Sequence, residues 1–158
     1  MLEELTAGFP ILSCILFLPV AGAVVLWLFD EEDMVRTSAL TIALVELALS
    51  VFVLLRFVPE SAAMQFTERV PWIPALGISY HLAVDGISVL FVGLTAFLTV
   101  LVVVYSWDTI RHQVKLYMMC LLALETTTMG VFVSLDLILF FVFWELMLLP
   151  MYFLIGIW

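Results

Sequence analysis

The chain has 158 residues, of which 66% are hydrophobic, 14% aromatic and only 12% charged, with a formal net charge of −9. No water-soluble domain of this length needs so large an apolar share, so the composition excludes an ordinary soluble protein and predicts an integral membrane protein. The negative charge alone does not point to a partner, because most of the acids lie at the ends of apolar stretches.

Five apolar stretches organise the chain, each about 20 residues long and so long enough to cross a hydrocarbon core of about 30 Å as a helix. We therefore expect an all-α membrane protein with a single transmembrane domain over residues 1–158. The expected helices cover about residues 10–29, 37–58, 86–105, 116–135 and 137–157. The connection at about 59–85 is expected outside the membrane, with a short surface hairpin.

The first helix follows a polar leader, Met1 to Gly8, that has no basic residues, which argues against a cleaved signal peptide. The second helix begins with Thr37 and Ser38 as candidate caps. It carries Glu46 close to its midpoint, with no basic residue within reach along the helix. Glu46 either handles protons or is a protonated structural acid that bonds to a neighbouring helix.

The connection contains two stretches, 64–70 and 78–84, in which apolar and polar residues partly alternate, as in half-buried strands. Prolines and a glycine separate these stretches, which favours a hairpin on the membrane surface. Trp72 and Tyr80 suit the interface, since each combines an apolar ring with a polar atom. His81 is interpreted as a surface residue rather than a ligand.

The third helix is preceded by Asp85, whose carboxylate suits a helix N-terminus. The segment after it carries the densest basic cluster of the chain, Arg111, His112 and Lys115. By the positive-inside rule this loop and the C-terminus are expected inside and the N-terminus outside, in a bacterial inner (plasma) membrane. Arg56 and Arg69 then fall outside and the first inner loop, 30–36, is acidic, so the rule is not satisfied cleanly.

The fourth helix has Glu125 at its centre, followed by three threonines, 126–128. Their hydroxyls either bond or order water beside the acid, or bond back to their own helix. Only three residues separate this helix from the fifth, so the two are expected to be antiparallel neighbours.

The fifth helix, over about residues 137–157, carries one ionisable group, Glu145. An acid near the middle of a membrane span is costly unless protonated, paired or wetted, and is by default a functional-site hypothesis. Pro150 frees the carbonyl of Leu146 next to this acid and is expected to kink the helix. The alternative is a structural glutamate bonded to a neighbouring helix.

Cofactor and metal sites are not expected, and neither are catalytic residues. Cys14 and Cys120 lie in different apolar stretches without a Cys/His cluster around them. Both histidines, His81 and His112, fall outside the expected helices, which argues against a transmembrane haem. What remains is a row of three mid-membrane acids, Glu46, Glu125 and Glu145, as candidates for proton translocation if water connects them.

Three segments carry a family resemblance: WIPALGISYHLAVDGISVLF (72–91), GVFVSLDLILF (130–140) and FFVFWELMLLPMYFLIGIW (140–158). Together they resemble the N-terminal part of the antiporter-like subunit M of bacterial NADH-quinone oxidoreductase, respiratory complex I. The resemblance covers nearly the whole chain, loosely in the first two helices and closely from Pro71 onward.

The resemblance implies a subunit of about fourteen helices, in which a glutamate on the fifth helix pairs with a lysine on a broken seventh helix. Glu145 matches that glutamate, and a change in its distance from the lysine would load and release a proton. This sequence contains neither the broken helix nor an intramembrane lysine, so the resemblance implies that a longer subunit or a partner chain supplies both. Glu46 and Glu125 match no motif of the family.

The function expected from these features is a contribution of a buried carboxylate to a proton path, with redox chemistry in other subunits of the complex. A subunit of a sodium/proton antiporter or of a membrane-bound hydrogenase is the near alternative. A non-conducting structural or assembly subunit is the alternative of another class. The expected partners are other membrane subunits and the lipid bilayer, and no nucleic acid is expected.

Overall fold

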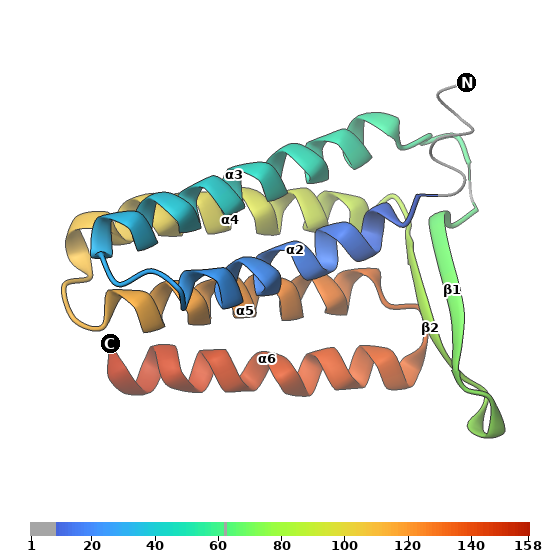
Figure 1. Ribbon diagram of the computed structural model, residues 1–158. Helices are drawn as coiled ribbons and strands as arrows, with labels where there is room; N and C mark the ends of the chain where they lie inside the picture. Colours follow the sequence, from blue (N-terminus) through green and yellow to red (C-terminus); the bar gives the residue numbers. More distant parts are fainter. Residues whose placement is uncertain (1–8, 62) are drawn as a thin grey trace.

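The structure, a computed structural model, describes residues 9–61 and 63–158, so the leader Met1–Gly8 lies outside it. Five helices lie side by side, and a two-stranded hairpin runs across one end of them (Figure 1). This arrangement confirms the expected all-α membrane class, with the hairpin between the second and third of the described helices. In chain order the elements are α2 (Ile11–Leu26), α3 (Glu32–Arg56), β1 (Gln65–Ile73), a 3₁₀ turn (Pro74–Leu76), β2 (Ile78–Val84), α4 (Ser88–Thr109), α5 (Val114–Val133) and α6 (Leu137–Ile157).

Helix α2 is shorter than expected. Helices α3 to α6 are each long and apolar enough to cross a membrane, whereas α2 has 16 residues and is about 24 Å long. The N–H groups of Trp27, Leu28 and Phe29 donate to carbonyls three residues back, at 3.0–3.2 Å. This tighter turn rises about 2 Å per residue. The apolar segment therefore reaches about 30 Å although its regular helix ends at Leu26.

Helix α3 begins five residues before the expected start, so Thr37 and Ser38 lie inside the helix and the expectation that they cap it is wrong. Glu32 and Asp33 occupy its first turn, where carboxylates are favourable. Arg36 follows three and four residues later, within 3.5 Å of Asp33 and 3.4 Å of Glu32. These pairs stabilise a polar first turn that the apolar pattern alone does not reveal.

Helix α5 is central to the packing. It contacts α2, α3, α4 and α6, while α3 also packs on α4 and on α2. Helix α6 packs mainly on α5, which confirms that these two helices are antiparallel neighbours (Figure 1). Gly22 lets α2 approach α3 closely, because a Cβ atom there would lie 2.6 Å from the Ile42 side chain.

The expected hairpin is present as an antiparallel pair of strands. Its register pairs Gln65 with Val84 and Arg69 with His81, with two irregularities along the ladder. The turn ends at Gly77, whose φ of 70° lies in the left-handed region that glycine adopts without strain.

Hairpin side chains cap the start of α2. The Glu68 carboxylate on β1 accepts hydrogen bonds from the N–H of Leu12 at 2.7 Å and the N–H of Ser13 at 3.1 Å. The Ser13 hydroxyl also donates to Glu68 and lies 2.7 Å from the Tyr80 hydroxyl on β2. The strand thus supplies acceptors for N–H groups that α2 leaves unpaired.

Two further acids connect this end to α4 and α6. The Asp85 carboxylate accepts from the N–H of Ser88 at 2.7 Å, and its own N–H donates to the Ser88 hydroxyl at 2.9 Å. Asp136 caps α6 by accepting from the N–H of Ile138 at 2.9 Å and also accepts from the N–H of Ser79 on β2 at 2.8 Å. These backbone N–H groups hold the pKa of both carboxyls below the usual range, with Ser88 and Ser79 respectively as the main cause.

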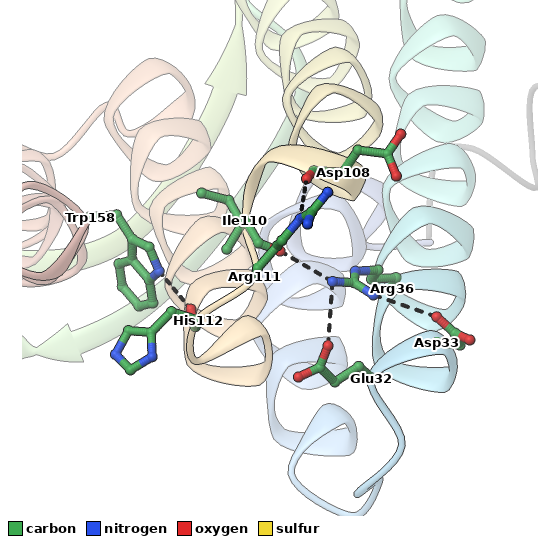
Figure 2. A network of polar contacts seen from close by, with 8 residues as sticks. All are labelled: Glu32, Asp33, Arg36, Asp108, Ile110, Arg111, His112 and Trp158. Carbon is green, nitrogen blue, oxygen red and sulfur yellow. Dashed lines mark hydrogen bonds and ion pairs between the residues drawn. The ribbon is translucent and has the colours of Figure 1, made fainter.

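The opposite end of the bundle carries most of the basic side chains. Figure 2 shows Arg36 between Glu32 and Asp33 on α3 and the carbonyl of Ile110 after α4, to which Arg36 donates at 3.1 Å. The Trp158 indole donates to the carbonyl of His112 at 2.7 Å, which joins the end of α6 to the loop before α5. Both connections fix the helices at the end remote from the hairpin.

Candidate functional site

The three candidate acids lie at nearly the same depth. Glu46 on α3, Glu125 on α5 and Glu145 on α6 are each about two residues, or about 3 Å, from the middle of their helix. The displacement is toward the hairpin end in all three, because α3 and α5 run toward that end and α6 runs away from it (Figure 1).

Glu46 and Glu125 are both buried in the interior of the bundle, where they are only 0% and 2% exposed. They lie on helices α3 and α5, which pack against each other. None of their four oxygens has a hydrogen-bond partner among the described residues. A buried polar atom without a partner is costly, so this pair is the most demanding polar site of the bundle.

Three buried residues with hydroxyl groups are neighbours of the two acids, two of them along the same helix. Ser50 lies one helical turn from Glu46 on the buried face of α3, and Thr126 is adjacent to Glu125; neither hydroxyl has a partner in the described part of the chain. Thr99 on α4 lies beside Glu125, while its hydroxyl donates to the carbonyl of Thr95 at 3.1 Å. These groups offer both donors and acceptors to the carboxyls.

The other two threonines of α5 bond back to their own helix. The Thr127 hydroxyl donates to the carbonyls of Ala123 and Leu124 at 3.1 and 3.0 Å, and Thr128 donates to Leu124 at 2.8 Å. Of the two readings of the threonine run, back-bonding therefore holds for Thr127 and Thr128. The Thr126 hydroxyl is buried and has no partner in the described part of the chain, so its role beside Glu125 stays a prediction.

Basic side chains are remote from the carboxyl pair. On α3, Arg36 and Arg56 are each ten positions from Glu46, and on α5 Lys115 is ten positions from Glu125, which corresponds to about 15 Å along each helix. Lys115 is also bound to Asp30, at 2.9 Å. The pair therefore has no cation at contact distance on its own two helices.

Glu145 lies apart from this pair, on the exposed outer face of α6. Trp144 and Leu146 on either side are exposed as well, as are Leu148 and Leu149 one turn away. Within this chain Glu145 is therefore exposed, whereas Glu46 and Glu125 are buried, and the part of any of them in a proton path stays a prediction. The physical reason is that α6 is apolar around its whole circumference, so its sequence does not select which face packs inward.

Close contacts hold α6 against α5 in this orientation. The ring of Phe143 occupies the space that a Cβ atom on Gly130 would need, so the two helices approach closely there. The Thr128 hydroxyl lies 3.6 Å from the Met147 sulfur. Pro150 is buried, and α6 continues through it as one helix to Ile157. The expected kink at Pro150 remains a prediction.

Curated relatives match nearly the whole chain. NADH-quinone oxidoreductase subunit M of Rhodobacter capsulatus is 43% identical over 154 residues, and that of Rickettsia felis is 36% identical over 156 residues, each covering 94% of this chain. The chain is similar to part of this subunit. It spans about a third of the length of these relatives, 30% and 32% respectively.

Two further comparisons agree with this similarity. NAD(P)H-quinone oxidoreductase chain 4 2 of Thermosynechococcus vestitus is 39% identical over 95% of this chain and 28% of its own. A solved structure of the Mrp complex from Dietzia superposes with a TM-score of 0.76 over 92% of this chain and 16% of the matched chain. At 21% identity that similarity concerns the fold alone. A scan against protein-family models found no match.

Thr99 was not predicted from the sequence, because α4 carries no ionisable residue near its middle that would single out a site. Its buried residues recur every three or four positions and include two hydroxyls, Thr99 and Ser106. Such a stripe predicts the packed face of a membrane helix, since small and hydroxyl residues concentrate at helix contacts. That signal could have placed Thr99 in the interior, although not beside Glu125.

Proposed function

We propose that this chain is part of a proton-translocating, antiporter-like membrane subunit of an NADH-quinone oxidoreductase. The observation that carries the proposal is the outward-facing Glu145 at mid-depth of α6, in a chain 33–43% identical to subunit M sequences. An acid facing hydrocarbon is unfavourable by several kcal/mol, so this face needs a cover that pairs, protonates or wets the carboxyl. Glu145 is then the residue through which the chain joins a longer proton path.

The proposed cover of α6 is one or more helices that carry a lysine at this depth, from the rest of the subunit or from a partner chain. The aromatic and aliphatic side chains around Glu145 offer an apolar contact surface, and the acid offers one charge to be matched. Pro150 adds a backbone carbonyl without a helical partner, that of Leu146, one position from Glu145. A movement of the lysine relative to Glu145 would change which of them holds a proton.

Electron transfer is assigned to other subunits of the proposed complex. The two cysteines and two histidines of this chain are distributed over different elements, and no group of three metal-ligating side chains occurs within the described ranges. In this proposal the chain contributes to ion movement alone.

For orientation, we propose that the hairpin end lies outside and that the end with Arg36, Arg111 and Trp158 lies inside. The support is the positive charge after α4, where Arg111 and His112 are exposed. All connections fall at the two ends of the bundle, so one orientation fixes the side of every loop (Figure 1).

The test is purification of the assembly from its native membrane through this chain, followed by identification of every co-purifying polypeptide. The proposal expects NADH-oxidising and quinone-reducing subunits together with a source of the additional helices. If antiporter or hydrogenase subunits co-purify instead, the chain belongs to one of those complexes. Recovery alone, or with unrelated proteins, would contradict a role in proton translocation and favour a structural one.

A further inference from the structure

We propose that Glu46 and Glu125 form one hydrogen-bonded carboxyl pair that exchanges a single proton, keeps a second one, and constitutes a proton-holding site separate from Glu145. Use of this site in transport rests on the proposed function. The sharing of protons by the pair is a property of the chain itself, so the two claims can fail independently.

The carboxyl oxygens of Glu46 and Glu125 have no hydrogen-bond partner among the described residues, and pairing of the two acids would give each of them one. All four oxygens are buried, and the two acids lie at nearly the same depth on helices that pack against each other. A protonated carboxyl donates one hydrogen bond, and a carboxylate accepts several. When one or both carry a proton, each residue therefore provides the partner that the other lacks.

The surrounding charges do not stabilise two carboxylates at once. Apart from the pair, the helices packed on this site carry their titratable groups near the ends or on outer faces. Cys14 lies in the first turn of α2, Asp108 near the end of α4 and Lys115 at the start of α5, while Glu145 faces outward on α6. Cys120 on α5 is buried but is uncharged as a thiol. Removal of both protons would leave two repelling charges without a counter-ion, so the pair retains at least one.

The nearby hydroxyls make the loss of the first proton feasible. Ser50 lies one helical turn from Glu46, and Thr126 follows Glu125 directly in the sequence; both are buried, and neither hydroxyl has a partner among the described residues. A carboxylate that accepts from the remaining carboxyl proton and from one or two hydroxyls is stabilised in the charged state. The site is thus organised to change its charge by one unit.

Apolar contacts separate this site from Glu145. Glu125 is buried, whereas Glu145 is exposed on the outer face of α6, across the contact between α5 and α6. That contact includes Gly130 against Phe143 and Thr128 against the Met147 sulfur. The described residues provide no chain of hydrogen bonds across it, so the pair and Glu145 are two sites and not one.

The test is infrared spectroscopy of the purified assembly across a pH titration, which follows the carbonyl stretch of protonated carboxyls. Glu46→Gln and Glu125→Gln are compared with the unmodified chain and with Glu60→Gln, a control at an exposed loop acid. In a coupled pair the two protons leave in separate steps that belong to the pair as a whole. The second step lies at higher pH because the first step has already left a negative charge on the pair. Both single variants are therefore expected to lose the step at higher pH.

Independent carboxyls give a different result. If the step at higher pH survives unchanged in one of the two variants, each acid titrates by itself and the proposal is overturned. It is also overturned if neither variant removes a protonated-carboxyl signal, because both acids are then ionised and held by a cation. Should either glutamine variant fail to assemble, Ser50→Ala and Thr126→Val replace it. At least one of these is expected to shift the first step to higher pH, and the absence of a shift in both contradicts the proposal.

Discussion

The ring of Phe143 on α6 lies against the backbone of Gly130 on α5, in the space that any larger side chain at position 130 would need. This contact allows the two helices to pack closely and fixes the rotation of α6 about its axis. Phe143 faces inward, and Glu145, two residues later, is exposed on the outer face. The orientation of the candidate proton-handling residue therefore depends on a glycine of the neighbouring helix.

Replacing this glycine is expected to destabilise the α5–α6 pair. In Gly130→Ala the new methyl group overlaps the Phe143 ring, and such overpacking costs about 1–3 kcal/mol. Unfolding equilibria in detergent or lipid measure the loss. Gly93→Ala on α4 is the matched control, because no atom lies within 4 Å of its added Cβ. Combining Gly130→Ala with Phe143→Leu should restore part of the stability, and the absence of any restoration would argue against a specific Gly130–Phe143 contact.

The start of α6 should loosen only at strongly acidic pH. The N–H of Ser79, followed by those of Leu139 and Ile138, holds the pKa of Asp136 below its usual 3.8. A carboxyl with a lowered pKa in the folded state stabilises at neutral pH, and this contribution disappears as the pH falls through that lowered value. Amide hydrogen exchange at Ser79 and Ile138 should therefore be slow at neutral pH. It should be faster in Asp136→Ala, and unchanged exchange in that variant would refute the connection between β2 and α6.

The proposed orientation predicts which loops are reachable from outside the cell. A cysteine introduced at exposed Ala75, in the turn of the hairpin, should react with a membrane-impermeant maleimide in intact cells. A cysteine in place of exposed His112, at the other end, should react only after the membrane is opened. The parent chain controls for Cys14 and Cys120. The reverse labelling pattern would invert the topology and place the hairpin inside.

Much of the fold could be predicted from local sequence patterns. Apolar length defined the membrane helices, and the alternating stretches around Gly77 predicted the hairpin because a strand has a two-residue period. The starts of the helices were harder to predict from the sequence. The first turn of α3 is stabilised by Glu32, Asp33 and Arg36, but this segment is as polar as a loop.

The arrangement of the acids could not be predicted from the sequence. Glu46 and Glu125 are 79 positions apart, and their proximity follows from how α3 packs on α5. Glu145 lies in a helix that is apolar on all sides, so no amphipathic pattern distinguishes an inner from an outer face. Its exposure results from the Gly130–Phe143 contact, which only tertiary structure reveals.

The buried pair and the outer acid should differ in their effect on transport. Glu125→Gln keeps the shape of the side chain and leaves Glu46 able to hold a proton, so we expect it to reduce proton transfer less than Glu145→Gln does. Proton movement by the two variants in the same reconstituted assembly provides the comparison. An equal or larger loss from Glu125→Gln would reverse this ranking and place the buried pair on the main path.

The most direct measurement is NADH-driven proton movement by the purified assembly in sealed liposomes, with Glu145→Gln compared against Glu60→Gln. If Glu145 belongs to the proton path, its variant should assemble with the full set of subunits and move protons at close to the background rate. The exposed loop variant should match the unmodified assembly. Undiminished proton movement by a fully assembled Glu145→Gln complex would contradict the account and leave the chain with a structural role.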